Sequence, residues 1–333
     1  VEAIAVCLLF SYLNPDNENK IKKIINKNFP NLPVCISSDI LPEIREFERA
    51  STAAMNAYVL PITEKYLTSL EKKISQLDID SSIQIMLSSG RLTTIDGAKK
   101  SPVEMLESGP AGGSMAGVHI GKQIGQDSIL TFDMGGTTAK ASLINQFKPE
   151  VTNQFEAGRV KRFRKGSGLP VRIPVIEMIE IGAGGGSIAY VDELGLLKVG
   201  PKSAGSEPGP VCYDKGGVQP TVTDADLTLG YLDENFFLGG TMNLNKQKAE
   251  EIIDKEIAQK LNVTVEKAAA GIHRVVSENM ANAARVHILE KGYDPRSFSM
   301  IAFGGAGPVH AYQVAKALNI PQIIIPIGAG VAS

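Results

Sequence analysis

The segment at residues 132–138 carries the residue types that phosphate chemistry needs. An apolar, strand-like run ends in Asp133, and two glycines and two threonines follow it: Gly135, Gly136, Thr137 and Thr138. Glycines let backbone N–H groups approach phosphate oxygens, and threonine hydroxyls can donate hydrogen bonds to the same oxygens. Asp133 could hold Mg²⁺, because this ion prefers carboxylate and phosphate oxygens. The alternative is an ordinary hairpin turn with an Asx hydrogen bond, and the residues alone fit both interpretations.

A second glycine-rich turn follows the strand-like residues 298–303. Its candidate site residues are Gly304, Gly305, Gly307 and Pro308. A strand that ends in glycines and opens a helix can bind phosphate or nucleotide, because helix N-termini present free N–H groups. The motif is neither a Walker loop nor G-x-G-x-x-G, so a glycine turn that serves only packing is the alternative. Of the four histidines, only His310, just after this turn, is placed near a site.

A third glycine stretch lies at residues 181–189 and defines a candidate ligand loop. Its proposed members are Gly184, Gly185, Gly186 and Ser187. A glycine stretch this dense indicates either a ligand loop or a domain junction. Residues 220–226 then add hydroxyls and two carboxylates. They could bind a metal, although a helix N-cap at Thr223 or Asp224 is the favoured interpretation.

The elements that must position these residues follow an α/β pattern. Strands are predicted at residues 1–10, 33–37 and 83–87, and helices at about 16–28 and 44–74, with a break or kink at Pro61. A strand, turn and strand at 128–144 predict a β-hairpin. Further predictions are a glycine turn at 108–113, a loop-rich β region at about 145–245, helices at 246–261 and 265–291, and strands at 298–303 and 320–326. A D-x-G-G-T hairpin with a later strand–G-G-x-G–helix turn is the phosphate and adenosine arrangement of the actin-like ATPase (ribonuclease H-like) fold.

The composition excludes several other classes of protein. The chain has 34 basic and 36 acidic residues in 333, a net charge of −2, and one basic run between residues 159 and 172. This balance argues against a nucleic-acid partner. The three cysteines form no metal, redox or disulfide pattern, which is consistent with a cytoplasmic location. No apolar run approaches the ~20 residues of a membrane span, so no membrane association is expected. The chain opens without Met inside a strand, and we expect it to be an internal fragment.

The motifs, in their order, resemble the A subunit of the hydantoinase/5-oxoprolinase family (hydantoin utilization protein A). The nucleotide-binding subunits of acetone and acetophenone carboxylases are related to this family. The resemblance runs nearly end to end. It rests on LPEIREFERASTAAMNAYVLP at 41–61, SGPAGG at 108–113, FDMGGTTAK at 132–140, IGAGGGSIAYVD at 181–192, VGPKSAGSEPGPVCYDKGG at 199–217, PTVTDADLTLGYL at 220–232 and AFGGAGPVHA at 302–311.

The resemblance implies an actin-like fold with mixed sheets that binds ATP and Mg²⁺. Residues 1–100 would be the remainder of an N-terminal α/β domain with a long connecting helix. Residues 101–333 would form the second actin-like domain, which includes the loop-rich insertion. The resemblance assigns Asp133 and the glycines and threonines of its turn to phosphate and Mg²⁺, and the 304–308 residues to adenosine. It gives no general acid or base.

The implied activity is an ATP-dependent hydrolase that opens hydantoin- or 5-oxoproline-like rings together with a B-type subunit or B region. Two alternatives stay open: the nucleotide-binding subunit of a ketone carboxylase, and a non-catalytic protein whose interactions are switched by ATP. The chain departs from the family pattern in two places. An earlier D-x-G-G-T-x-T-D hairpin is absent, and Lys140 stands in the region where the second hairpin often ends in Asp. We therefore expect this 333-residue chain alone to be inactive.

Overall fold

The computed structural model of the chain describes all residues except 78, 80, 159–165 and 332–333. Its backbone contacts divide it into two compact units, which are described separately. The first unit holds residues 1–112 and 151–177, and the second holds residues 113–150 and 178–333. Residues 151–177, which the sequence analysis placed in the insertion of the second domain, thus pack with the first unit. The basic run falls largely on residues 159–165, outside the described part of the chain.

The first unit begins with a parallel pair of short strands, β1 (Ile4–Val6) and β2 (Val34–Ile36), with α1 (Asp16–Asn28) between them in sequence. The long helix α3 (Glu46–Ser75) packs against these strands through its buried residues. This helix continues through Pro61, so of the predicted break or kink the break is wrong. The loss of one backbone hydrogen bond at Pro61 is compensated by tertiary packing, because Ala57, Leu60 and Leu67 are buried.

Short elements complete the first unit. They are α2 (Ser37–Ile40), the hairpin of β3 (Gln84–Met86) and β4 (Leu92–Thr94), α4 (Ile95–Lys100), the pair of β8 (Val151–Thr152) and β11 (Val175–Ile176), and the pair of β9 (Phe155–Ala157) and β10 (Leu169–Val171).

Two fully buried charged residues, Glu18 of α1 and Arg49 of α3, connect the first elements of this unit through hydrogen bonds. The Glu18 carboxylate accepts from Ser37 and from backbone N–H groups, and Arg49 donates to Ser37 and to backbone carbonyls.

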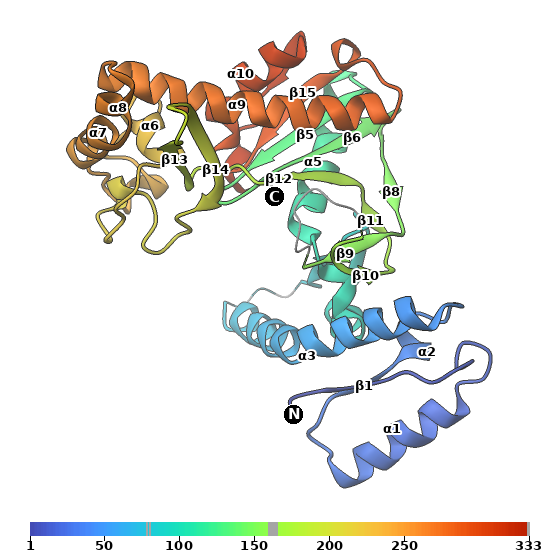
Figure 1. The fold of residues 1–333 in the computed structure, drawn as a ribbon. Helices are drawn as coiled ribbons and strands as arrows, with labels where there is room; N and C mark the ends of the chain where they lie inside the picture. Colours follow the sequence, from blue (N-terminus) through green and yellow to red (C-terminus); the bar gives the residue numbers. More distant parts are fainter. Residues whose placement is uncertain (78, 80, 159–165, 332–333) are drawn as a thin grey trace. The chain divides into compact units, whose positions relative to one another are not determined.

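A mixed sheet forms the centre of the second unit (Figure 1). Its strand order is β12 (Met178–Ile181), β6 (Ala139–Asn145), β5 (Ile129–Met134), β15 (Ser299–Phe303) and β16 (Gln322–Ile324). The first three strands are antiparallel, and β15 and β16 run parallel to β5. The short β7 (Lys148–Pro149) pairs with β6. The hairpin, the strand before the second glycine turn and the final strand were predicted, and the mixed α/β class is confirmed.

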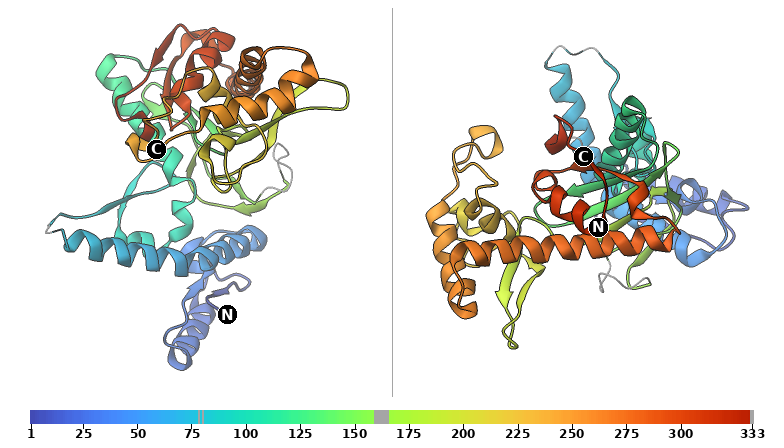
Figure 2. Two further views of the ribbon diagram at one scale, coloured as in Figure 1. Left: turned by 90° about the vertical axis from the view of Figure 1, so that its left-hand side faces the viewer. Right: turned by 90° about the horizontal axis from the view of Figure 1, so that it is seen from above.

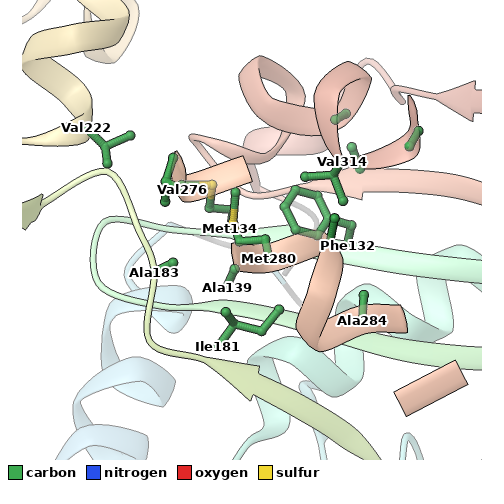
Figure 3. Packing of buried hydrophobic residues seen from close by; sticks show 14 of the residues in the cluster. Phe132, Met134, Ala139, Ile181, Ala183, Val222, Val276, Met280, Ala284 and Val314 are labelled. Atoms are coloured by element: carbon green, nitrogen blue, oxygen red, sulfur yellow. The ribbon is translucent and has the colours of Figure 1, made fainter. Parts of the chain in front are cut away.

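Helices cover both faces of this sheet, which Figures 1 and 2 show from three directions. On one face α9 (Val265–Glu290) and α10 (Gly307–Leu318) pack on the main apolar core, part of which is drawn in Figure 3. On the other face α5 (Ser108–Ile124) packs on a smaller core. Because side chains alternate along a strand, Phe132 belongs to the first core and Ile129 to the second.

Helix α5 contradicts one prediction. It begins at Ser108 and includes the residues that were expected to form a glycine-rich turn at 108–113. Two later glycines explain why it lies so close to the sheet. A Cβ on Gly117 would stand 2.7 Å from the Thr131 side chain, and one on Gly121 would stand 2.3 Å from Ile129.

Three buried hydroxyls cross this helix–sheet contact. Ser142 Oγ lies 2.5 Å from Ser114 Oγ of α5 and 2.6 Å from Thr131 Oγ1 of β5. Thr131 and Ser142 are also direct cross-strand partners in the hairpin. All three residues are almost fully buried, and their hydrogen bonds satisfy polar groups that water cannot reach.

The loop-rich region ends in a small helix, α6 (Val222–Thr228). The sequence pattern favours Thr223 or Asp224 as its N-cap, but the cap is Thr221. Its side chain accepts from Asp224 N–H, and the Asp224 carboxylate accepts from Thr221 in return, which makes a capping box. The remaining elements are β13 (Ser187–Val191), β14 (Leu197–Ser203), and α7 (Lys246–Ile253), which continues through a π-helical turn into α8 (Gln259–Leu261). In the described residues, no helix has the length and apolar character that crossing a membrane requires.

Candidate functional site

The first predicted site motif forms a tight hairpin turn at the end of β5. Gly135 N–H donates to the Thr138 carbonyl at 3.1 Å, and Met134 pairs with Ala139 across the hairpin. Asp133 lies at the end of the strand, partly buried, opposite Lys140 in the register. The turn residues Gly135, Gly136, Thr137 and Thr138 are therefore presented together beside one carboxylate, as the sequence pattern predicted.

The outer side of this turn is open. Gly136 and Thr137 are exposed, and a Cβ on Gly136 would meet no atom within 4 Å. Among the described residues, the N–H groups of Gly136 and Thr137 have no hydrogen-bond partner. Two consecutive N–H groups without partners in an exposed glycine turn can contribute to the kind of concave nest that binds anions.

The candidate ligand loop at 184–187 packs directly behind this turn. Gly185 N–H donates to the Gly135 carbonyl at 3.0 Å, and Gly186 N–H donates to the Gly136 carbonyl at 2.6 Å. Gly184 N–H donates to Ser187 Oγ at 2.9 Å. A Cβ on Gly184 would lie 2.6 Å from the Thr137 carbonyl carbon, which explains the need for glycine. Because these amides already have partners and the loop is buried, its contact is with the hairpin turn.

The second predicted turn approaches the hairpin from the neighbouring strand. β15 is parallel to β5, so the strand end at Phe303 lies beside Asp133. Ala306 N–H donates to the Met134 carbonyl at 2.9 Å. Gly304 has φ +80°, and a Cβ there would lie 2.4 Å from Met134 O and 2.5 Å from Asp133 Oδ1. Gly307 also packs near Met134, whereas Gly305 faces open space. Pro308 lies in the first turn of α10.

The structure thus brings together all of the residues selected from the sequence. The 184–187 loop contacts the 135–138 turn, and the 304–308 turn contacts Asp133 and Met134 directly before that turn, so all three segments meet at one end of the sheet. Their glycines differ in role. Gly136 and Gly305 face open space, whereas Gly184 and Gly304 allow the segments to approach closely.

A buried cluster whose members are far apart in the sequence lies next to these turns. It joins Asp226 of α6, His273 of α9 and His310 of α10, all nearly or fully buried. His273 Nδ1 lies 2.8 Å from Asp226 Oδ1, and His310 Nε2 lies 3.1 Å from Asp226 Oδ2. Ser277 Oγ lies 3.1 Å from His310 Nδ1. His310 was placed near a site. His273 was not, because its partner Asp226 lies 47 residues away in sequence.

The Asp226 carboxyl carries a charge in spite of its burial. Burial raises its pKa, but the hydrogen bonds and positive potential of His273 and His310 outweigh this effect and lower the pKa below the usual value of 3.8. In the unfolded chain these partners are absent, so the carboxyl binds its proton at higher pH than in the folded protein. The stability that follows is complete above pH 3.8 and is lost as the pH falls through the lower, folded-state pKa.

We therefore expect Asp226→Asn to destabilise the protein by about 3 kcal/mol at pH 7, since it breaks a buried charged network. The difference between the two proteins should shrink as the pH falls from 3.8 through the lower pKa of the folded state, because the wild-type carboxyl is protonated first in the unfolded chain and then in the folded protein as well. Denaturant unfolding of both proteins over pH 2–7 measures this difference. A constant difference across that range would contradict a charged Asp226.

Comparison with known proteins identifies the family. A family model for hydantoinase/oxoprolinase matches residues 49–333. The chain belongs to the hydantoinase/oxoprolinase family. The resemblance that the motifs indicated is thereby confirmed. The site described above accordingly lies within the part of the chain that the family model matches.

Three relatives of this hydantoinase/oxoprolinase chain match it over nearly all of its length. It is 44% identical to an uncharacterized protein of Methanocaldococcus jannaschii, over 100% of this chain and 49% of that protein. It is 38% identical to caprolactamase subunit alpha of Pseudomonas jessenii, over 98% of this chain and 46% of that subunit. The crystal structure of that ATP-dependent caprolactamase matches with a TM-score of 0.78 at 36% identity, covering 100% of this chain and 47% of the other.

The third relative is a ketone carboxylase. A nucleotide-free structure of acetone carboxylase, from work on ATP-dependent acetone carboxylation, matches with a TM-score of 0.84 at 30% identity. The match covers 100% of this chain and 46% of the other. The present chain thus spans about half the length of the relatives it matches.

Proposed function

We propose that this chain is the nucleotide-binding A part of an enzyme that uses ATP to open a cyclic amide ring of the hydantoin, 5-oxoproline or caprolactam kind. The observation that carries the proposal is the convergence of the 135–138 and 304–308 turns beside Asp133. Family membership and the ATP-dependent caprolactamase relative support it. The mixed sheet that ends in these two turns also supports the actin-like ATPase assignment and the division into two α/β domains.

The residues present fit ATP and Mg²⁺. The free N–H groups of Gly136 and Thr137, with the hydroxyls of Thr137 and Thr138, would bind phosphate oxygens. Asp133 would hold Mg²⁺, which takes one or two carboxylates together with phosphate oxygens. Gly305 faces open space on the side proposed for adenosine. When bound, ATP supplies a phosphoryl group that can activate the otherwise unreactive amide carbonyl.

The substrate and its partner subunit are inferred from the relatives. Caprolactamase subunit alpha is by name one subunit of its enzyme, and we propose that a B-type subunit or region accompanies the present chain. A nucleotide-binding role in a ketone carboxylase is the second candidate, because the acetone carboxylase structure covers the whole chain with the higher TM-score.

The test is ADP release by the intact protein, assembled with its partner, in the presence of different substrates. Hydantoin, 5-oxoproline and caprolactam form one arm, and acetone or acetophenone with bicarbonate forms the other. We expect ATP hydrolysis to rise with at least one ring, and mass spectrometry to show the opened product. Turnover only with ketone and bicarbonate would favour the carboxylase. ATP binding that alters partner affinity without any turnover would instead indicate a non-catalytic switch.

Gly136→Ala tests the phosphate side of the site. The added methyl group meets no protein atom within 4 Å, so stability should change by less than about 0.5 kcal/mol. The methyl would nevertheless stand where phosphate oxygens approach, so we expect ATP affinity to fall about tenfold or more. Calorimetric ATP titration and thermal unfolding measure the two effects. Gly195→Ala is a weaker comparison, because Gly195 also faces open space but has φ +75°. Unchanged ATP affinity in Gly136→Ala would place the phosphates elsewhere.

A further inference from the structure

The site segments and the buried cluster are linked by a closed circuit of contacts. On one side, the 135–138 turn is held by Gly185 and Gly186, and the Gly185 carbonyl in turn accepts from Thr223 N–H at 2.8 Å and Thr223 Oγ1 at 2.9 Å. Thr223 lies in α6, three residues before Asp226. On the other side, Ala306 binds Met134, and the helix that follows carries His310. The Asp226–His310 contact closes this circuit.

His310 is held on both edges of its imidazole. Ser277 Oγ, which donates to the His273 carbonyl at 2.8 Å, lies 3.1 Å from His310 Nδ1. His310 Nε2 lies 3.1 Å from Asp226 Oδ2. Asp226, Ser277 and His310 are all nearly or fully buried, so water does not compete for these contacts.

The ring geometry argues against a metal ion between these residues. The imidazoles of His273 and His310 are stacked, with centroids 4.3 Å apart and planes 17° apart. Zinc lies about 2.0–2.1 Å from a histidine nitrogen, along a lone pair in the ring plane. Two nearly parallel planes at this separation cannot both contain one ion at that distance. A carboxylate with two oxygens suits them better, since each ring meets a different oxygen of Asp226.

We infer that Asp226 and His310 are positioning residues: their buried side-chain contact holds the 304–308 turn against the end of β5, next to the 135–138 turn, and so sets the affinity for ATP without touching it. The inference rests on the proposed function. A buried hydrogen bond to a carboxyl group suits this task, because such a bond is strong at low dielectric and a buried polar group that loses a partner is penalised. Asp226 also links the pair to the loop behind the hairpin, because α6 carries both Asp226 and Thr223.

The experiment compares His310→Gln and Asp226→Asn with His273→Gln in the intact protein. His273 is the matched control, because it is stacked on His310 and bound to Asp226 but lies on α9, which carries none of the three site segments. We expect the first two variants to raise Kd and KM for ATP about tenfold and to leave KM for the second substrate unchanged. The control should change ATP binding less than twofold, even if it unfolds at lower temperature.

Hydrogen exchange of the peptide that spans 302–310 gives a readout independent of ATP. It should accelerate in His310→Gln and not in His273→Gln, and it remains informative if Asp226→Asn fails to fold. Equal ATP affinity in wild type and His310→Gln would overturn the inference alone. No ATP binding by the wild type would overturn the proposed function and the inference with it. One equivalent of bound metal, lost in Asp226→Asn, would overturn the direct contact between Asp226 and His310 as the basis of the inference.

Discussion

Asp133→Asn is expected to lower ATP-dependent turnover at least about a hundredfold, because it removes the charge proposed to hold Mg²⁺ while it preserves the size of the side chain. Asp133 is the last residue but one of β5, and its carboxylate lies where a Cβ on Gly304 would be only 2.5 Å away. A neutral amide at this position offers one weak oxygen ligand. Steady-state ADP release with varied Mg²⁺ measures the loss.

Asp127→Asn is the matched control for this prediction. Asp127 precedes the same strand at its other end and is exposed, so the identical chemical change should leave turnover within about twofold. Circular dichroism and thermal unfolding establish that both variants are folded. If Asp133→Asn retained wild-type turnover and wild-type Mg²⁺ dependence, the carboxylate would have no part in the reaction.

Gly304→Ala is expected to destabilise the second unit by about 2–5 kcal/mol and to abolish ATP binding. An alanine at φ +80° costs about 1–2 kcal/mol, and the inserted methyl would overlap the Met134 carbonyl, at a further cost of about 1–3 kcal/mol. Relief of this overlap must move either the 304–308 turn or the end of β5, and Asp133 moves with the latter. Denaturant unfolding and ATP titration record the two effects.

The adjacent glycine gives a control with the same chemistry. Gly305 faces open space and its φ lies outside the left-handed range, so Gly305→Ala should change stability by less than about 0.5 kcal/mol. Its effect on ATP binding depends only on contact with the nucleotide. Similar stability losses in the two variants would show that the close approach of Gly304 to β5 is not what requires glycine.

Local signals explain what the sequence revealed. The Asp133 hairpin was predictable because a strand-length apolar run meets two glycines and then resumes as a second strand. The 304–308 turn was predictable because glycines and Pro308 separate a buried strand from an amphipathic helix. The convergence of the two turns was a family-level expectation. It arises physically because β5 and β15 are parallel neighbours in one sheet.

Long-range contacts explain what the sequence could not reveal. Asp226 and His310 are 84 residues apart and lie on different helices, so no spacing rule connects them. Gly184 was correctly noted as part of an unusual stretch, but whether its amide faces a ligand or the protein depends on the fold. Similarly, Pro61 and the glycines near residue 110 have low helix propensity, and tertiary packing overrides it.

The three hydroxyls between α5 and the hairpin bear on which hairpin forms at all. Both β5 and β6 are buried along most of their length, on both faces of the sheet, so their apolar residues alone do not strongly disfavour a slip of one residue. A slip would separate Thr131 from Ser142, leave their hydroxyls without partners in a dry interior and turn Asp133 to the opposite face. Ser114, Thr131 and Ser142 therefore help to fix the register of the hairpin, because a misaligned pairing that apolar packing would tolerate would leave their hydroxyls without hydrogen bonds.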